Sequence, residues 1–387
     1  MGDDLSKRSV LIVATVSGFI RSFELNDISI LQERGYTVHV ATRIAEEDKR
    51  FFQHRGVILH QIDFERFPFK SNNFKAIKII QKIIADNDIS LVHCHTPVGG
   101  VIARLAAKKF RKQGCKVIYT VHGLQFYKGA PKKDWLIYYP VEKYLSKYSD
   151  AIVTINSEDY TLVSNRFLNE KTYYIPGVGI DISKMTTKEM DIQKKWKKRK
   201  SLGLNEQDTV LLSVGELNAN KNHHVIIDAI SMNKNREIKY LIAGKGPLAN
   251  ALQQKIHDLN LSNQVFLLGY RTDITELLQC SDIFVHPSKR EGLSVALMEA
   301  MASGLPVVCS RIRGNTDLID DGKGGYLCEV NDINAYMNAL IRLSDDPDLC
   351  HQMSVYNQSK IQEFSINVVD QKMRSIYREV TQDNPIK

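Results

Sequence analysis

The sequence predicts an α/β protein with two Rossmann-like domains, each built on a parallel β-sheet, that face each other across a cleft. The chain has 387 residues, which is enough for two domains that each bury a core. Short β-branched runs alternate with longer segments of helical periodicity, and this series occurs twice. A break rich in proline and glycine at 175–179 separates the two series. We therefore expect an N-terminal domain at 1–176, a C-terminal domain at 177–363 and a final helical segment at 364–387.

Each half has its own set of expected strands. In the first half they lie at 9–14, 37–42, 57–61, 91–94, 117–120 and 151–155, with a helix at 74–85. In the second half they lie at 209–214, 239–243, 265–268, 282–286 and 306–309, and Ser365 is expected to cap the last helix. Ligands of such sheets bind at the carboxyl ends of the strands, so the active site is expected in the cleft.

Charge is distributed unevenly along the chain. Residues 1–176 contain 26 Lys+Arg and 18 Asp+Glu, a surplus of +8, whereas residues 177–387 contain 26 of each. A basic first half suits an anionic partner, and an ordinary solvated basic face explains the count equally well. The basic stretch at 194–200 is interpreted as a solvated helix face. No apolar run reaches the ~18 residues of a membrane span.

The six cysteines show neither metal-binding pairs nor the density of a disulfide scaffold. Most stand beside apolar residues, as buried thiols do, and this favours a reducing cytoplasm. The apolar run near the N-terminus is short and is interpreted as a first strand rather than a signal peptide.

The strongest motif runs from Pro287 to Gly304 and predicts strand, loop and helix. Glu291 lies in the loop and Glu299 in the helix, which Ser294 opens. The amides of Gly292, Leu293, Ser294 and Val295 would face an anion at the helix N-terminus, where the helix dipole also favours negative charge. A diphosphate fits there, with Glu291 on sugar hydroxyls and Glu299 on ribose hydroxyls. Two glutamates eight residues apart also occur by chance, so the prediction rests on their setting.

A second motif follows the first strand of the second half. Gly215 comes directly after that strand, and Lys221 lies in the next loop, where a cation can meet a departing diphosphate. A surface lysine in a polar loop is the alternative. Lys245 lies in a Gly-Lys-Gly-Pro segment that is interpreted as a tight turn beside the same pocket.

In the first half, His122 ends a strand and is expected near the reacting sugar, although a buried structural histidine is the alternative. Gly18 is expected in a turn after the first strand, where backbone can approach substrate. His93 and His95 project to one face of a strand. No third metal ligand is evident in the sequence, so we expect no metal site.

Together these motifs resemble the family-4 glycosyltransferases, retaining enzymes of the GT-B fold, over nearly the whole chain. Glu291 and Glu299 match the family's E-x(7)-E motif, Gly215 and Lys221 its donor loop, Gly18 its first glycine loop and His122 its histidine. The resemblance implies that the final helix crosses back onto the first domain. The segment 95–159 is more specifically similar to capsule and exopolysaccharide transferases.

The resemblance implies transfer of a sugar, with retention, from a nucleotide-diphosphate sugar, expected to be a UDP-sugar. The implied acceptor is a growing surface polysaccharide or oligosaccharide linked to polyprenyl diphosphate. No cofactor, metal ion or nucleic acid is expected, and the implied location is cytoplasmic, with peripheral contact to the inner face of the plasma membrane as an option. Alternatives are a nucleotide-sugar epimerase or phosphorylase of the same fold, or a non-enzymatic binder of nucleic acid or membrane.

The chain departs from the family at one position. Many members place arginine after the loop glycine, where this chain has Glu216. A carboxylate beside a diphosphate is repulsive, so Glu216 is expected to turn away or to be compensated by another cation, with Arg290 and Lys245 as candidates.

Overall fold

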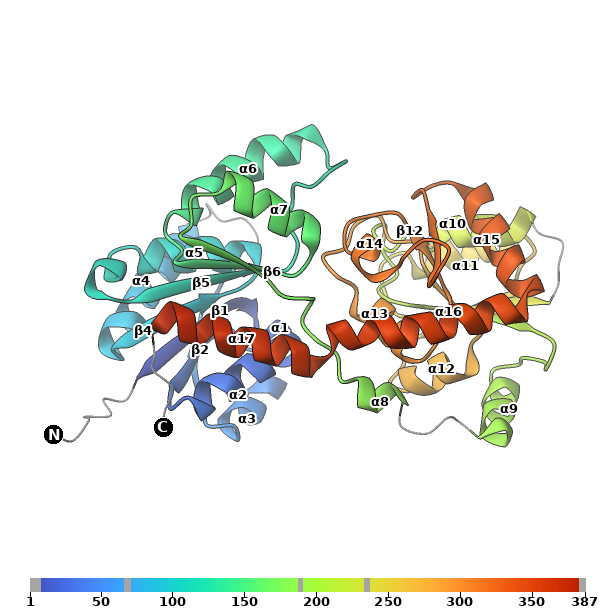
Figure 1. The fold of residues 1–387 in the computed structure, drawn as a ribbon, viewed down its shortest axis with the longest axis horizontal. Helices are drawn as coiled ribbons and strands as arrows, with labels where there is room; N and C mark the ends of the chain where they lie inside the picture. Colours follow the sequence, from blue (N-terminus) through green and yellow to red (C-terminus); the bar gives the residue numbers. More distant parts are fainter. Residues whose placement is uncertain (1–7, 66–70, 187–190, 233–236, 383–387) are drawn as a thin grey trace. The chain divides into compact units, whose positions relative to one another are not determined.

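The computed structural model describes residues 8–65, 71–186, 191–232 and 237–382 and divides the chain into two compact units (Figure 1). The first unit contains residues 1–178 and 367–387, and the second contains residues 179–366. Each unit is built on a parallel sheet with helices around it. The prediction of two Rossmann-like domains is confirmed.

The first unit has a seven-stranded sheet in the order β3-β2-β1-β4-β5-β6-β7, with every pair parallel. The central strands β1, β4 and β5 are buried along most of their length, as expected of a parallel sheet covered by helices. The bounds are β1 Ser9–Val16, β2 Thr37–Arg43, β3 Ile58–Gln61, β4 Ile89–Cys94, β5 Lys116–Val121, β6 Ala151–Thr154 and β7 Lys171–Tyr174.

The helices of the first unit come mainly from the first half of the chain. They are α1 Ser17–Phe23, α2 Leu25–Glu33, α3 Glu46–Gln53, α4 Ser71–Asp86, α5 Pro97–Ala107, the 3-10 helix Phe110–Gln113, α6 Lys132–Ser146 and α7 Ser157–Arg166. The last helix, α17 Ile366–Thr381, belongs to this unit in all but its first residue. Its buried Tyr377 donates to or accepts from His93 Nδ1 at 2.8 Å, and Arg374 pairs with Glu33 at 2.6 Å.

The second unit has a six-stranded parallel sheet in the order β10-β9-β8-β11-β12-β13. The strands are β8 Thr209–Val214, β9 Ile238–Ala243, β10 Val265–Gly269, β11 Ile283–His286, β12 Val307–Ser310 and β13 Gly325–Cys328. Its helices are α8 Ile182–Thr186, α9 Ile192–Ser201, α10 His224–Met232, α11 Ala249–Asp258, α12 Ile274–Cys280, α13 Val295–Ala302, α14 Asn315–Leu318, α15 Ile333–Asp345, α16 Pro347–Lys360 and the 3-10 helix Ile361–Phe364.

The chain enters and leaves the second unit at neighbouring points. Ile180 N–H donates to Phe364 O at 3.1 Å, and Ile366 N–H donates to Ile180 O at 2.8 Å. Gly179 has a φ of +75°, and a Cβ there would lie 2.8 Å from the Cα of Ile366. Glycine is therefore required where the two chain segments meet.

The structure differs from the sequence-based expectations at three places. Strands β7 and β13 were not predicted, because Lys171–Tyr174 is only half-buried and Gly325–Cys328 is short. Gly18 does not lie in a turn, since β1 extends to Val16 and α1 begins at Ser17. The interpretation of 194–200 as a solvated face is wrong for Arg199, which is buried and donates to Asp282 at 2.6 Å.

Most of the remaining expectations from composition hold. Five of the six free cysteines are buried and Cys350 is half-buried. Burial raises the pKa of Cys94 and of Cys115 to about 12, which makes these thiols unreactive. Among the described residues, no helix combines the length and apolarity needed to cross a bilayer.

Candidate active site

Two loops of the second unit meet at the carboxyl ends of β8 and β11, which are neighbouring strands of the sheet. Lys221, from the loop after β8, places Nζ 2.7 Å from Oε1 of Glu291, from the loop after β11. Asn220 joins the backbones of the same loops, because Lys289 N–H donates to Asn220 O at 2.8 Å and Asn220 Nδ2 donates to Arg290 O at 2.9 Å. The structure thus brings together the lysine and the first glutamate singled out from the sequence.

The ion pair between Lys221 and Glu291 is largely shielded from solvent. The two side chains are 21% and 14% exposed. Burial raises the pKa of Glu291, but His286, 3.2 Å from Oε1, and Lys221 outweigh burial and hold that pKa below its usual range. Glu291 is therefore an anion at neutral pH, with the Lys221 ammonium beside it.

Gly215 makes room for the lysine. A Cβ at Gly215 would lie 3.1 Å from Cε and 3.3 Å from Cδ of Lys221, so the lysine stem lies across the bare glycine backbone. Asn218 Oδ1 accepts from the amides of Asn220 and Lys221, both at 3.0 Å, and fixes the turn that leads to the lysine. The lack of a side chain at Gly215 and the turn held by Asn218 together position the Lys221 ammonium.

The segment after β9 packs backbone to backbone against this loop. A Cβ at Gly244 would lie 1.8 Å from Gly215 O, and a Cβ at Gly246 would lie 2.4 Å from Leu217 O. Leu217 N–H donates to Lys245 O at 2.9 Å. The Gly-Lys-Gly-Pro segment is therefore a support for the Gly215 loop, and the Lys245 side chain itself is exposed.

Helix α13 begins where the sequence predicts. Ser294 is its N-cap and accepts from Leu297 N–H at 3.3 Å. In the part of the chain that the structure describes, the amides of Gly292, Leu293 and Val295 donate to no other protein group. Glu299 lies in the second turn of the helix, half-buried, and burial raises its pKa. The loop thus offers backbone donors to an anion directly beside Glu291.

Glu216, the position of the departure, lies in the loop between Gly215 and Lys221. The Glu216 side chain is exposed, and its Oε2 accepts from Asn218 Nδ2 at 2.8 Å. Arg290, one of the two candidate compensating cations, is exposed beside Glu291. Glu216 thus has a neutral partner of its own within the loop.

Sequence reasoning missed two residues that support Glu291. His286 ends β11 and is buried, with Ser288 Oγ 3.2 Å from its Nε2 and Glu291 Oε1 at the same distance. Buried Arg313 donates through Nε to the backbone carbonyl of Glu291 at 3.2 Å. The position of His286 at a strand end, like that of His122, is a signal that could have identified it.

In the first unit, His122 lies at the carboxyl end of β5 within a cluster of buried polar side chains. His122 Nε2 is 3.2 Å from His95 Nδ1, and Glu24 Oε1 lies 3.3 Å from the former and 3.2 Å from the latter. His95 follows β4, and Glu24 lies between α1 and α2. The edge of the Phe19 ring packs at the His122 ring, with centroids 4.8 Å apart.

A second layer lies behind these three residues. His93 contacts Tyr377 through Nδ1 and Thr120 through Nε2, both at 2.8 Å, and Asp27 Oδ2 lies 3.7 Å from His93 Nδ1. Burial lowers the pKa of His93 to about 3 and of His122 to about 4, and raises that of Glu24 to about 8. Both histidines are therefore neutral at pH 7.

The structure places potential third ligands beside His93 and His95, which the sequence did not reveal, and the absence of a metal site stays a prediction. Glu24, His95 and His122 present three ligand atoms within 4.8 Å of one another, and Asp27, His93 and His95 form a second such group. Sequence reasoning missed Glu24, between α1 and α2, and Asp27, on α2, because both lie far along the chain from the histidines.

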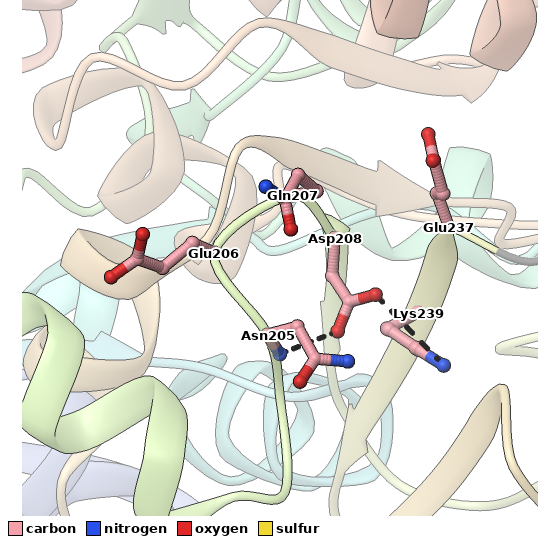
Figure 2. A pocket seen from close by; sticks show the side chains of 6 residues that line it. All are labelled: Asn205, Glu206, Gln207, Asp208, Glu237 and Lys239. Carbon is pink, nitrogen blue, oxygen red and sulfur yellow. Dashed lines mark hydrogen bonds and ion pairs between the residues drawn. The ribbon is translucent and has the colours of Figure 1, made fainter.

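A polar hollow lies at the opposite edge of the second sheet, where β8 and β9 begin (Figure 2). Its lining residues are Asn205, Glu206, Gln207, Asp208, Glu237 and Lys239. In Figure 2 Asp208 and Lys239 face each other, 3.9 Å apart, and Glu206 points away from them. Three carboxylates and one ammonium make this hollow unsuited to a diphosphate.

The comparisons with known proteins agree with this geometry. Residues 194–360 match the family described as "Glycosyl transferases group 1", and residues 10–156 match "Glycosyl transferase 4-like". A putative glycosyltransferase EpsD of Bacillus subtilis is 34% identical over 377 residues, which cover 96% of each chain. An Escherichia coli UDP-Gal:alpha-D-GlcNAc-diphosphoundecaprenol alpha-1,3-galactosyltransferase is 32% identical over 280 residues, 71% of each chain. The crystal structure of Anabaena HepE in complex with UDP and glucose superposes with a TM-score of 0.77 at 20% identity, over 96% of this chain and all of HepE.

Proposed function

Since the chain belongs to the group 1 and 4-like glycosyltransferases of GT-B fold and acts in polysaccharide biosynthesis, we propose a specific reaction for it. It transfers a sugar from a UDP-sugar to an acceptor linked to polyprenyl diphosphate, with retention of the anomeric configuration. The Lys221–Glu291 pair beside the start of α13 supports this proposal, because a cation, a carboxylate and backbone N–H donors lie close together there.

Each group has a role in the proposed reaction. Lys221 and the amides of Gly292–Val295 stabilise the negative charge that develops on the departing UDP. Glu291 accepts from sugar hydroxyls, and Glu299 accepts from ribose hydroxyls. The acceptor oxygen attacks the anomeric carbon from the face that the diphosphate leaves, and its proton passes to the departing phosphate oxygen. His122 hydrogen-bonds the transferred sugar or the acceptor.

The choice of donor and acceptor class draws on the relatives. The Escherichia coli relative is named for UDP-galactose and a diphosphoundecaprenol acceptor, and HepE was crystallised with UDP and glucose. The surplus of +8 in residues 1–176 suits an acceptor that carries a diphosphate.

The test is a transfer assay with the purified chain, a set of UDP-sugars and short polyprenyl-diphosphate-linked acceptors. We expect UDP release that depends on acceptor, continues in the presence of EDTA, and yields a product whose anomeric configuration by proton NMR matches that of the donor. An inverted product would contradict the retaining mechanism. UDP-sugar consumption that needs no acceptor would instead indicate an epimerase.

We further propose that the enzyme works at the cytoplasmic face of the plasma membrane, held by basic residues after α5. Lys108, Lys109 and Lys112 are exposed, whereas Arg111 is committed to Asp150 and Glu170 at 3.0 and 2.9 Å. Lys108 Nζ lies over the Tyr148 ring, 4.9 Å from its centroid, and the three exposed lysines can meet anionic lipid at roughly 1 kcal/mol each.

Liposome flotation tests this surface. Capture by anionic vesicles that weakens with salt and is lost when the three lysines become glutamine supports it. Equal behaviour with neutral vesicles, or no capture, means that the lysines only form a solvated basic face.

A further inference from the structure

The cluster around His122 fixes where the proton of each imidazole lies. His95 Nε2 is buried and has no hydrogen-bond partner among residues 8–65, 71–186, 191–232 and 237–382, whereas His95 Nδ1 has His122 Nε2 at 3.2 Å. A buried N–H without an acceptor is costly and rare, so neutral His95 carries its proton on Nδ1 and donates it to His122 Nε2. His122 is neutral as well, and with Nε2 accepting, its single proton lies on Nδ1.

This arrangement depends on Glu24. Oε1 of Glu24 lies 3.3 Å from His122 Nε2 and, within the described part of the chain, has no hydrogen-bond partner of good geometry. A carboxylate so close to the Nε2 lone pair would be repelled by it and would draw the His122 proton from Nδ1 to Nε2. An uncharged Glu24 leaves the proton on Nδ1. The charge of Glu24 therefore decides whether His122 Nδ1 is a donor or an acceptor.

We propose that Glu24 is a positioning residue that, in its neutral form, keeps His122 in the Nδ1–H tautomer, so that this imidazole donates a hydrogen bond to the sugar or acceptor. The inference rests on the proposed function in one respect, since it assumes that His122 contacts a substrate. Glu24 itself contacts none and acts through the tautomer of His122.

The surroundings of Glu24 favour its neutral form. Glu24 is 3% exposed and lies beside Asp27, a second buried carboxyl group. Burial raises the pKa of Glu24 to about 8 and raises that of Asp27 as well. The titratable groups that face this site include Glu24, Asp27 and Arg34 from the α1–α2 segment, His93 and His95 from the end of β4, His122 from the end of β5, and Asp370 and Tyr377 from α17.

The first test is the pH dependence of turnover. Glu24 is neutral below its raised pKa and ionises above it, so wild-type kcat should be level near pH 7 and fall above about pH 8. Glu24→Gln cannot ionise, and we expect it to keep kcat within about threefold at pH 7 and to lose the alkaline decline. Glu24→Ala should lower kcat about tenfold, the value of one lost positioning hydrogen bond, with little change in KM for the UDP-sugar. Recovery from alanine to glutamine separates positioning from simple packing.

The second test reads the tautomer without turnover. In protein labelled with 15N-histidine, long-range 15N–1H correlations distinguish Nδ1–H from Nε2–H, and His122→Ala identifies the His122 signals. We expect Nδ1–H at pH 7 in wild type and in Glu24→Gln, with a change to Nε2–H above pH 8 in wild type alone. An Nε2–H tautomer in wild type at pH 7 would overturn the inference.

The outcomes distinguish the proposed role of His122 from the proposed role of Glu24. If His122→Ala retains wild-type turnover, the proposed role of His122 fails. If His122→Ala is inactive while Glu24→Gln keeps the alkaline decline, the proposed role of His122 stands and the inference about Glu24 fails. One equivalent of zinc bound by the purified wild type and absent from His122→Ala also overturns the inference, since the three ligand atoms would then hold a metal in place of shared protons.

Discussion

Replacement of Lys221 by methionine removes the cation of the candidate donor site and keeps the length of the side chain. The side chains of Lys221 and Glu291 are 21% and 14% exposed, so the burial of this pair is intermediate between that of a surface pair and that of a fully buried pair. A surface pair contributes about 0.2–1 kcal/mol to stability, and disruption of a fully buried pair costs about 3–5 kcal/mol. With His286 still in contact with Glu291, we expect Lys221→Met to lower the free energy of unfolding by about 1–2 kcal/mol. The protein should therefore remain folded.

The effect on turnover should be much larger than the effect on stability. Removal of one group that stabilises charge in a transition state costs about 3 kcal/mol, or roughly 100- to 1,000-fold in kcat. The assay is UDP release in parallel with urea unfolding. Lys255→Met is the matched control, because Lys255, on α11, pairs with Asp228, on α10, at 2.6 Å in the same unit and belongs to neither of the loops that carry Lys221 and Glu291. Turnover of Lys221→Met within threefold of this control would refute the assignment of the donor site.

Three other predictions concern residues of the second unit, one of them with a glycine of the first unit for comparison. Glu299→Gln should weaken binding of the UDP-sugar roughly tenfold in calorimetry, the loss of one hydrogen bond to a charged group, with little change in stability; unchanged affinity would remove Glu299 from the site. Gly244→Ala should lower the free energy of unfolding, measured in urea, by about 2–3 kcal/mol, because its Cβ would lie 1.8 Å from Gly215 O. Gly18 lies in a helix with open space around its Cβ position, so Gly18→Ala should raise the free energy of unfolding by about 0.5–1 kcal/mol. Equal effects of the two substitutions would contradict these contacts. The pKa of Glu291 in the folded protein is lower than in the unfolded chain, so its ion pair should stabilise the protein fully above about pH 4.3 and should lose this stabilisation only below that pH. The difference in free energy of unfolding between wild type and Glu291→Gln should therefore be constant from pH 5 to 7 and shrink in more acid solution.

The fold was predictable because both sheets are parallel and buried. Strands such as β1 and β8 appear in the sequence as continuous apolar runs, and turn residues mark their ends. The missed strands lie at the edges of their sheets, where one neighbour is lacking and burial is incomplete, so β7 has almost no apolar signal. Arg199 was misread because its charge is satisfied by Asp282, 83 residues away, and no local pattern reveals a partner at that distance.

The candidate site was predictable for residues that closely follow the end of a strand in the sequence. Lys221 and Glu291 each follow a strand closely, and β8 and β11 are neighbours in the sheet, so the two residues meet. Glu24 and Asp27 lie on a helical segment whose sequence resembles an ordinary amphipathic surface. Their burial against His93 and His95 depends on the packing of that segment on β4, and only the three-dimensional structure shows it.

The place of α17 has a consequence for the order in which the protein can fold during synthesis. Residues 1–178 leave the ribosome first, yet their unit lacks Met373, Ile376 and Tyr377 until α17 has been made, and all three are buried. Residues 179–366 form a continuous unit that can complete its own sheet in the meantime. Until then the nascent first unit has an uncovered apolar surface, and His93 Nδ1 lacks its Tyr377 partner. If synthesis stops before Tyr377, the released chain can fold its second unit but cannot complete its first.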